Sequence, residues 1–551
     1  MKRLVAEFLV AVMLVVGCQP QGGGPQEGTR ELGHAGVKRI TVATVESLAT
    51  VNQDDNLTPL FMAGLVNFDS EGEPTAQLAE QAPTIENGLW KLLPDGQMET
   101  TLTIRPNVRW HDGTPLTTAD LVFGAAVAQQ YPQGNFGTAA FANIETMEPR
   151  DARTIVVSWK RPYVQANWLF SDLFAQPLPR HLLEESFREL DNAAFLNLRF
   201  WTSEFVGNGP FVVDDFAPGT YLRLKAFDLY VPGRPKLDEI EIRFITNANT
   251  LMANLLAGEI DLTLGPGLSI EQSLKAREAW PEGEVIYSSN YETQAVGYPQ
   301  FVNPSPPILA NVQFRRALAH AIDRDEIVQS IQAGVGAAAS ALVAPTGSEF
   351  EAVKHAIADY PYDPRRAGQI IEGLGFSKGA DGLFRDSTGL ELAVHAWTGA
   401  ESDTYVRTTL AVVDYWRRVG VAAEPRTIPA TSDRSVMPSR PGFQMAALRT
   451  HVDTRFLSSE TPLAENNFRG SNRARYMNRD LDALIDRYFS TVPRPERLGV
   501  LADVVRHLSE NVVVIHLFYN AVPQMKSQRL KNVPARTVRA RAPDSHLWDL
   551  S

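Results

Sequence analysis

Trp110, His111 and Asp112 stand side by side, and a histidine next to a carboxylate can act as a general base or bind a metal ion. No second metal ligand follows this pair after four positions, and no nucleophile pattern accompanies it. Asp112 and Gly113 form a dipeptide that is typical of tight turns, which places the pair at the end of a strand. We interpret these residues as structural, and we expect neither a catalytic site nor a metal site here.

The surrounding pattern predicts the elements that position these residues. Residues 100–104 alternate as a strand does, with apolar side chains at every second position. Thr117 and Asp120 fit a capping box before the apolar run 121–128. A helix is predicted to begin there.

A second histidine and carboxylate, His320 and Asp323, lie near the end of an apolar stripe. The stripe has the spacing of one helix face and consists of Phe314, Ala317, Leu318, Ala321 and Ile322. Asp323 also begins a capping-box pattern with Glu326, ahead of another helix. The sequence favours helix-boundary residues over the alternative, which is a catalytic pair.

Several common catalytic patterns do not occur in the chain. It contains no G-x-x-x-x-G-K-[ST] loop, no G-x-S-x-G elbow, no H-E-x-x-H and no C-x-x-C. The chain is therefore not the ATPase of a transporter, and we expect no catalysis, no cofactor and no bound metal. A secreted peptidase or esterase of another type is the enzymatic alternative.

Length and composition indicate a water-soluble protein with more than one lobe. A chain of 551 residues exceeds what one compact core usually holds, and 44% apolar with 21% charged residues is ordinary for a globular protein. A net charge of −12 without a basic run argues against nucleic acid and against a polybasic membrane patch. We expect a monomer that binds a small ligand.

The N-terminus has the features of an export signal. Basic residues precede the apolar run 8–16, which is too short to span a bilayer. Cys18, the only cysteine, follows small and apolar residues, as in the lipobox of bacterial lipoprotein precursors. We predict a signal peptide at 1–17 and lipidation of Cys18, and the alternative is a buried free cysteine.

Residues 18–37 form a predicted tether between the lipid and the body of the protein. They are rich in Gly, Gln and Pro, and we expect them to be disordered and to hold the body roughly 25 Å from the bilayer. No later apolar run reaches the ~18 residues of a membrane span. The protein is therefore predicted to be extracytoplasmic and bound to a bacterial membrane through its lipid alone. A lipid-anchored chaperone and a sensor ectodomain are the non-enzymatic alternatives.

From residue 38 onward, strand and helix patterns alternate, which indicates an α/β chain. Residues 38–47 and 238–245 have strand patterns, and residues 251–264 indicate a helix, a glycine stop and a strand. Residues 363–375 predict another helix between an aspartate cap and a glycine stop. Crossover helices between strands build parallel sheets.

Seven segments of the chain resemble family 5 extracellular solute-binding proteins, the oligopeptide, dipeptide and nickel receptors of ABC importers. In the order of the family they are LAE at 78–80, RP at 105–106, DGTPLT at 112–117, DLVF at 120–123, GNGPF at 207–211, LAGEIDL at 256–262 and FRRALAHAIDRDEI at 314–327. The resemblance covers most of residues 38–525. The chain departs from the family pattern at Asn208 and Phe211, where Gly-Thr-Gly-Pro-Tyr is usual, and at 227–231.

The resemblance implies a two-lobed, periplasmic-binding-protein-like α/β fold with an inserted subdomain and a ligand cleft between the lobes. It implies lobe I at 38–64, 186–285 and 508–551, the insert at 65–185 and lobe II at 286–507, with the hinge near 286 and 508. The implied function is a receptor that closes over a peptide and delivers it to an ABC transporter permease. A receptor for a sugar or a nickel complex is the alternative within the same fold.

Candidate ligand contacts lie where strands of lobe II end, because α/β sheets bind ligands outside the carboxyl ends of their strands. A strand predicted to end at Trp397 makes that ring a candidate wall of the site, and burial in the core is the alternative. Asp453 follows a second strand and resembles the aspartate that binds the ligand's α-amino group in peptide-binding members, and a solvated loop aspartate is the alternative. His451, in the same loop, is the third candidate.

Overall fold

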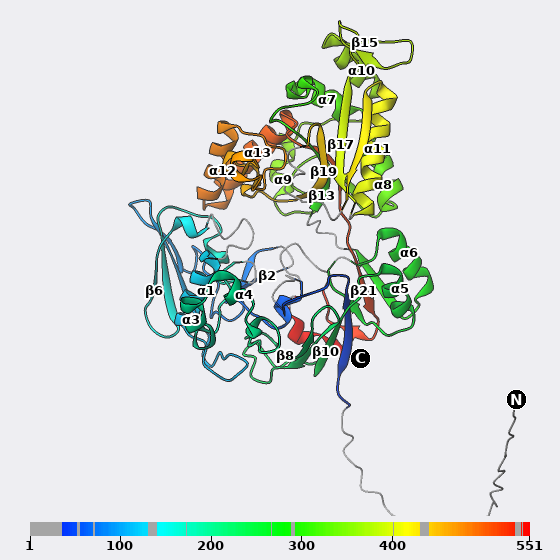
Figure 1. Ribbon diagram of the computed structural model, residues 1–551. Coiled ribbons are helices and arrows are strands. Elements are labelled where there is room, and N and C mark those ends of the chain that lie inside the picture. Colours follow the sequence, from blue (N-terminus) through cyan, green and yellow to red (C-terminus); the bar gives the residue numbers. More distant parts are fainter. Residues whose placement is uncertain are drawn as a thin grey trace, which may run out of the picture. The chain divides into compact units, whose positions relative to one another are not determined.

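The structure is a computed structural model that describes residues 36–51, 56–69, 72–130, 140–171, 174–265, 267–287, 293–400, 402–429, 440–534, 542 and 544–551 (Figure 1). The predicted signal peptide, Cys18 and all but the last two residues of the tether lie outside these ranges. Within the ranges, no helix combines the length and the apolar character that a membrane crossing requires. Lys38 begins the folded body of the protein.

The first sheet of the body has seven strands that come from distant parts of the chain (Figure 1). In spatial order they are β12 (Gly283–Tyr287), β21 (Pro523–Ser527), β11 (Leu262–Thr263), β1 (Arg39–Thr44), β10 (Glu239–Phe244), β9 (Tyr221–Ala226) and β8 (Phe211–Ala217). β1 pairs in parallel with β10 and with β11, as the crossover pattern predicts. Helix α5 (Ala248–Leu256) makes the crossover from β10 to β11, and α6 (Ile270–Ala279) follows β11.

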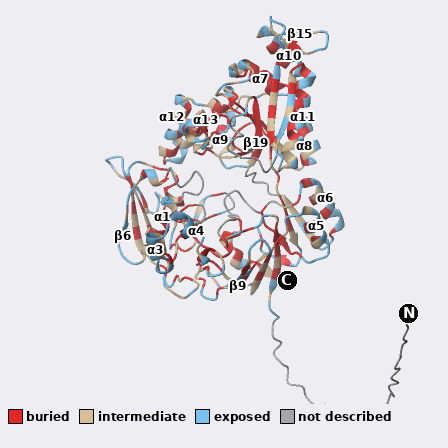
Figure 2. Cartoon of the chain, in the orientation of Figure 1, coloured by how far each residue is buried: buried red, intermediate tan, exposed pale blue. Residues whose placement is uncertain are grey.

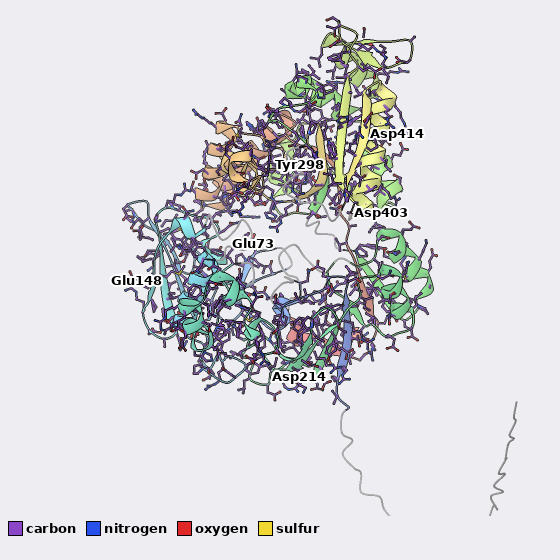
Figure 3. All side chains as sticks on the ribbon, viewed as in Figure 1. Glu73, Glu148, Asp214, Tyr298, Asp403 and Asp414 are labelled. Carbon is purple, nitrogen blue, oxygen red and sulfur yellow. The ribbon has the colours of Figure 1, made fainter. Side chains whose placement is uncertain are left out.

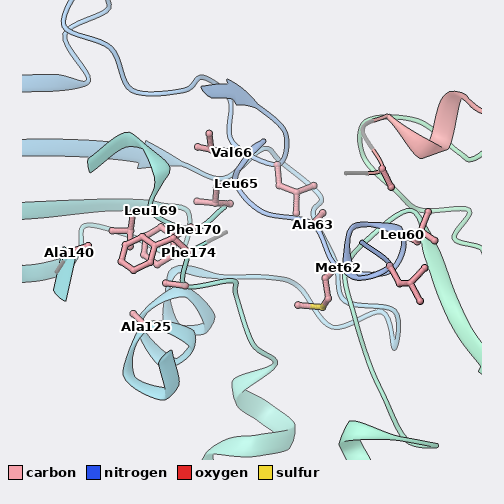
Figure 4. Close-up of a cluster of buried hydrophobic side chains, with 14 of the residues drawn as sticks. Leu60, Met62, Ala63, Leu65, Val66, Ala125, Ala140, Leu169, Phe170 and Phe174 are labelled. Carbon is pink, nitrogen blue, oxygen red and sulfur yellow. The ribbon is translucent and has the colours of Figure 1, made fainter. Parts of the chain in front are cut away.

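Residues between β1 and β8 build a smaller, antiparallel sheet of four strands. Its order is β4 (Trp90–Leu92), β5 (Met98–Thr103), β7 (Thr154–Trp159) and β6 (Ile144–Pro149). The same part of the chain holds the hairpin of β2 (Val66–Phe68) and β3 (Pro74–Ala76) and the helices α1 (Thr118–Gln130), α3 (Arg180–Glu189) and α4 (Asn192–Leu196). Figure 4 shows part of its core, where Phe170 and Phe174 belong to the same buried cluster as Ala125 and Leu65.

The other large sheet has six strands. In spatial order they are β14 (Ala337–Ala338), β20 (Ile515–Tyr519), β13 (Thr293–Pro299), β19 (Phe443–Arg449), β17 (Ala393–Gly399) and β18 (Ala422–Ile428). We call it the second sheet. Its helices are α7 (Val312–His320), α8 (Arg324–Gln332), α9 (Phe350–Val353), α10 (Pro364–Gly373), α11 (Asp403–Val419), α12 (Arg479–Ser490) and α13 (Arg494–Glu510).

Helices cover the second sheet on both of its faces. α11 packs on β17, β18 and β19, with α8 beside it, and α12 and α13 lie on the other side (Figure 1). Figure 2 shows β19 as a largely buried strand between these layers. On one face Phe443 contacts Trp416 of α11, with ring centroids 4.8 Å apart. On the other face Leu448 belongs to the cluster that includes Leu501 of α13.

The chain passes between the two large sheets twice. β12 of the first sheet is followed by β13 of the second, and β20 of the second is followed by β21 of the first. The return crossing therefore lies between Tyr519 and Pro523. The boundary expected at residue 508 is too early, because β20 pairs with β13 and completes the second sheet before the chain returns.

His320 and Asp323 mark a helix boundary, as predicted. α7 ends at His320, whose Nδ1 lies 2.8 Å from the carbonyl oxygen of Pro361. Asp323 caps α8 by accepting a hydrogen bond from the amide of Glu326 at 2.9 Å. At the start of α1 the predicted capping box has one arm, in which the Asp120 carboxylate accepts from the amide of Thr117 at 2.8 Å.

Three stacked rings join the antiparallel sheet to α12. Trp159, the last residue of β7, stacks on Tyr163 with centroids 5.6 Å apart, and Tyr163 stacks on Phe489 at 6.1 Å. The amide of Val164 donates to the carbonyl of Phe489 at 2.8 Å. We call Trp159, Tyr163 and Phe489 the aromatic tie. All three rings are buried, so the tie belongs to the core.

Candidate ligand-binding site

One edge of the second sheet collects the ends of four strands. β17 runs parallel to β18 and β19, and β13 runs antiparallel to β19 and β20. β17, β18, β19 and β20 therefore point their carboxyl ends to the same edge, which we call the carboxyl edge. α11 begins beside it at Asp403 (Figure 3). Loops that leave such an edge are where α/β sheets bind ligands.

Asn520 connects three elements at the carboxyl edge. Its side-chain amide donates to the hydroxyl of Thr293 at 2.8 Å and to the hydroxyl of Tyr405 at 3.1 Å. Its backbone amide donates to the carbonyl of Thr293 at 2.9 Å. Thr293 begins β13 and Tyr405 lies in the first turn of α11. Asn520 therefore fixes the phenol of Tyr405 at the edge.

Asp453 lies in the loop after β19, as predicted, and it is only 3% exposed. Its Oδ1 accepts from the amide of Arg455 at 3.0 Å and so caps a short turn (Thr454–Phe456). Its Oδ2 lies 2.6 Å from Nε of Arg455. These two atoms are not aligned as a hydrogen bond, so they form a short contact between opposite charges.

Burial raises the pKa of the Asp453 carboxyl group, and the positive charges of Arg455 and Arg449 oppose that rise. A carboxylate held this far from water needs a positive partner. Arg455 supplies that partner from the same turn. The role predicted for Asp453, binding a ligand's ammonium group, stays a prediction.

Tyr298 lies near the carboxyl end of β13, which is at the opposite edge of the second sheet because β13 runs antiparallel to β19. The Tyr298 hydroxyl donates to the carbonyl of Ala447 at 2.9 Å, and burial raises the pKa of Tyr298 to about 12 against the opposing charge of Arg473. The backbone of Arg473 is held by Gln300, whose Nε2 donates to its carbonyl at 2.8 Å. The guanidinium group of Arg473 is exposed and, among the residues that the structure describes, makes no ion pair or hydrogen bond.

Trp397 lies inside β17 and not at its end, which corrects the predicted boundary. The strand continues to Gly399 because its pairing with β18 continues to Ile428. Nε1 of Trp397 donates to the carbonyl of Pro441 at 2.8 Å, and the guanidinium of Arg440 lies 5.4 Å from the ring centroid. The ring is half-buried, and its role as a wall of the site stays a prediction.

His451 is half-buried in the loop between β19 and Asp453, and its role in ligand binding also stays a prediction. The sequence did not identify Tyr405, Asn520 or Arg473. A tyrosine in the first turn of a helix that follows a strand is a weak local signal for Tyr405. Asn520 and Arg473 have no such signal, because their neighbours come from distant parts of the chain.

His111 holds the backbone of a glycine-rich segment. Its Nδ1 accepts from the amide of Gly207 at 3.2 Å, and its Nε2 lies 3.0 Å from the carbonyl of Gly209. Burial lowers the pKa of His111 to about 4, which favours the neutral ring that this pair of contacts requires. Asp112 contacts His181 at 2.6 Å. His111 and Asp112 lie in the turn that the sequence predicted, and the absence of a catalytic role stays a prediction.

The same glycine-rich segment fits closely around residues 61–63. Asn208 is buried, and its side-chain amide accepts from and donates to the backbone of Ala63, both at 2.9 Å. A Cβ atom on Gly207 would lie 2.1 Å from the carbonyl oxygen of Phe61, and one on Gly209 would lie 2.4 Å from its carbonyl carbon. Only glycine therefore fits at both positions.

A pocket of about 220 Å³ lies at the amino end of β20, away from the carboxyl edge. Arg324 in its wall donates to the carbonyls of His516 at 2.7 Å and Tyr360 at 3.1 Å, and so joins two chain segments. This arrangement gives the arginine a structural role. In the described part of the chain, no three His, Cys, Asp or Glu side chains gather as metal ligands.

Residues 74–489 match the model of the bacterial extracellular solute-binding proteins, family 5. A putative ABC transporter peptide-binding protein of Brucella ovis is 27% identical over 307 residues, which are 56% of this chain and 55% of that protein. The match thus spans about half the length of the curated relative.

Two solved structures have the same fold. NikZ of Campylobacter jejuni in complex with Ni(L-His) has a TM-score of 0.75 at 20% identity, over 93% of this chain and 99% of that chain. The oligopeptide-binding protein AppA of Bacillus subtilis in complex with a nonapeptide has a TM-score of 0.71 at 18% identity, over 94% and 99%. The body therefore has the two-lobed α/β fold of these binding proteins.

Proposed function

The chain belongs to the family 5 bacterial extracellular solute-binding proteins, and from that premise we propose that it is the receptor of an ABC importer. It closes two lobes over a peptide outside the cytoplasm and delivers that peptide to the permease, without catalysing a reaction. The observation that carries the proposal is the pair of large sheets connected by only two chain crossings, with strand ends gathered at the carboxyl edge.

The proposed first lobe comprises 38–64, 186–287 and 520–551, and the second lobe comprises 293–519, with the insert at 65–185. The two crossings between the lobes lie beside each other, because Tyr287 pairs with Pro523 in one sheet and Gln294 pairs with Tyr519 in the other. Two adjacent segments can bend together as a hinge. A ligand that contacts both lobes then selects the closed form through those additional contacts.

Small-angle X-ray scattering tests the closure. We expect the radius of gyration to decrease when a solute binds. An unchanged value with a solute whose binding calorimetry has established would contradict the proposed closure.

The choice of a peptide is supported by the names of similar proteins, a peptide-binding relative and an oligopeptide-binding structure. The alternative is another solute, since a structure of the same fold is a complex with Ni(L-His). Native mass spectrometry of the purified protein separates these possibilities. We expect a series of peptide masses on the folded protein. If a single sugar or metal complex is found instead, that solute is the ligand and the peptide assignment is wrong. Release of cleaved products would indicate a hydrolase.

The remaining part of the proposal concerns the membrane. Signal peptidase removes residues 1–17, Cys18 carries the lipid and residues 18–37 act as a tether. Confinement at the membrane raises the effective concentration of the monomeric receptor near its permease. The support for the anchor comes from the sequence, where Cys18 is the only cysteine and ends an apolar N-terminal run.

A further inference from the structure

The pocket at the amino end of β20 has the size and the charges of a binding site for a small solute. Its walls come from the segments 319–325, 338–340, 358–362 and 509–516, and we call it the β20 pocket. We propose that it binds a free amino acid as a zwitterion, with the carboxylate on Arg324 and the ammonium group toward Asp325 and Asp359. The volume of about 220 Å³ is below the roughly 300 to 1,000 Å³ of sites for drug-sized ligands.

The β20 pocket is closed at its floor, open at its rim and separate from the carboxyl edge. Ala339 and Ile515 in its lining are buried, whereas Asp325 and Asp359 are exposed. A solute can therefore enter from the surface. β20 extends from Ile515 at the pocket to Tyr519, and at 3.4 Å per residue its two ends lie about 14 Å apart. A molecule in this pocket does not occupy the site proposed at the carboxyl edge.

Arg324 carries a charge that no carboxylate balances directly. Its Nε donates to the carbonyl of His516 at 2.7 Å, and its Nη1 donates to the carbonyls of Tyr360, Ala319 and Ile322 at 3.1, 3.3 and 3.5 Å. Nη2 makes no hydrogen bond, and the guanidinium group makes no ion pair, with any residue that the structure describes. Carbonyls fix the group but do not neutralise it. A ligand carboxylate supplies the counter-charge and accepts from Nη2.

His516 supplies a buried acceptor in the lining of the same pocket. It is 5% exposed, and its Nδ1 lies 2.7 Å from Oε1 of Gln294. Nε2 of Gln294 donates to the carbonyls of Ala341 and Leu342 at 3.1 and 3.2 Å, so Oε1 accepts and Nδ1 of His516 donates. Burial lowers the pKa of His516 to about 3, so the ring is neutral. Its Nε2 is then an acceptor without a partner in the described ranges, and a ligand ammonium group can donate to it.

Three carboxylates balance the charge of a ligand ammonium group. Asp323, Asp325 and Asp359 line the pocket. Asp323 uses Oδ1 to cap α8, while Asp325 and Asp359 form neither a hydrogen bond nor an ion pair through their side chains with the described part of the chain. Three negative charges against the positive charge of Arg324 give the lining a formal charge of −2. Its field therefore favours a positive group at the rim.

This arrangement of charges selects a zwitterion over a simple ion. A small anion at Arg324 would be repelled by the three carboxylates, and a small cation would be repelled by the guanidinium group. An amino acid avoids both costs, because it carries its carboxylate and its ammonium group on one carbon atom. Ile322, Pro361 and Tyr362 also line the pocket, so we expect an aliphatic side chain such as that of leucine to pack there.

Calorimetry of the full-length protein with three compounds tests the ligand class. L-Leucine carries both charges, L-leucinamide lacks the carboxylate, and N-acetyl-L-leucine lacks the ammonium group. We expect leucine to bind and each analogue to bind about 10- to 100-fold more weakly, as for the loss of a charged hydrogen bond. An analogue that binds as tightly as leucine would show that the pocket does not select a zwitterion.

Substitutions at the rim test the place of binding. Asp325→Asn combined with Asp359→Asn should weaken the binding of leucine by about 2- to 30-fold, because each exposed carboxylate contributes about 0.2 to 1 kcal/mol. Asp480→Asn is the matched control, since Asp480 is exposed and is the second residue of α12, as Asp325 is of α8. Unchanged binding in the double variant would overturn the assignment.

Arg324→Gln should bring the affinities for leucine and leucinamide to within about 3-fold of each other, because the group that distinguishes them is gone. This variant also loses bonds to carbonyls, so circular dichroism first establishes that it is folded. The double variant at the rim removes none of the described hydrogen bonds and decides the question if the arginine variant does not fold.

Native mass spectrometry distinguishes the β20 pocket from the proposed cleft. We expect leucine to add to protein that still carries its co-purified solute. Displacement of that solute by leucine would place leucine in the cleft and overturn the second site. Failure of leucine to bind would also overturn it, and neither result would contradict the proposed receptor function.

Discussion

Asn520 and Thr293 fasten the two chain crossings to each other by two hydrogen bonds, one between backbone groups at 2.9 Å and one between side chains at 2.8 Å. Thr293 begins β13 and Asn520 follows β20, so both bonds lie where the crossings meet the second sheet. Any rotation of the proposed lobes must therefore take place between this pair and the first sheet.

Asn520→Ala should lower the free energy of unfolding by about 1 to 3 kcal/mol, because the hydroxyls of Thr293 and Tyr405 lose their donor. Urea denaturation followed by circular dichroism measures the change. Asn254→Ala is the control, since the side chain of Asn254 makes an exposed hydrogen bond to the carbonyl of Thr250 within its own helix. An equal loss of stability in the two variants would contradict the stabilising role of the bonds that Asn520 makes to Thr293 and Tyr405.

Gly207→Ala should destabilise the protein by more than about 2 kcal/mol, because the new Cβ would lie 2.1 Å from the carbonyl oxygen of Phe61. Gly368→Ala is the matched control. Gly368 lies inside α10, where an added Cβ atom would meet nothing within 4 Å, so alanine should stabilise the protein by up to about 1 kcal/mol. Thermal unfolding of both variants compares the signs of the two changes in stability. If Gly207→Ala does not lose stability, the close approach at Gly207 is disproved.

The stability of the protein should depend on His111 between pH 6.5 and 4. Burial lowers the pKa of His111 to about 4, so the unfolded chain binds a proton in this range that the folded chain does not. The stabilisation by the neutral ring is complete above pH 6.5 and decreases by about 3 kcal/mol as the pH falls through 4. His111→Gln should therefore differ from the unmodified protein most at pH 7 and least at pH 4. Parallel stability curves would contradict the buried neutral ring.

Cys18→Ser should release the protein from the membrane fraction, because one residue supplies the whole predicted anchor. Cell fractionation followed by immunoblotting measures the distribution, and labelling with a radioactive fatty acid should fail in the variant. A variant that stays with the membrane would show that another segment holds it there.

Local patterns predicted individual elements well. The cap and stop that predicted a helix at 363–375 correspond to α10, where Asp363 accepts from the amide of Arg366 at 2.8 Å. The strict alternation at 238–245 corresponds to β10, whose side chains alternate between half-buried and buried. Such features depend on neighbours within a few residues, so the sequence contains the whole signal.

Long-range pairing was the part that the sequence did not predict. Ile515–Tyr519 could have been assigned to either large sheet, and its pairing with β13 decides the position of the return crossing. The carboxyl edge is likewise assembled from residues as distant as Thr293 and Asn520. The partner of Asp453 is only two positions away, yet the direction of the Arg455 side chain depends on burial in the folded loop.

The aromatic tie favours forms of the protein in which α12 stays packed on the insert. The insert is fastened to the first lobe through the bond of His111 to Gly207, and to α12 through Tyr163 and Phe489. If opening of the hinge separates α12 from the insert, it must expose rings that are now buried, at a cost of a few kcal/mol. Reburial of these rings on closure would then add to the free energy by which a bound solute draws the two lobes together.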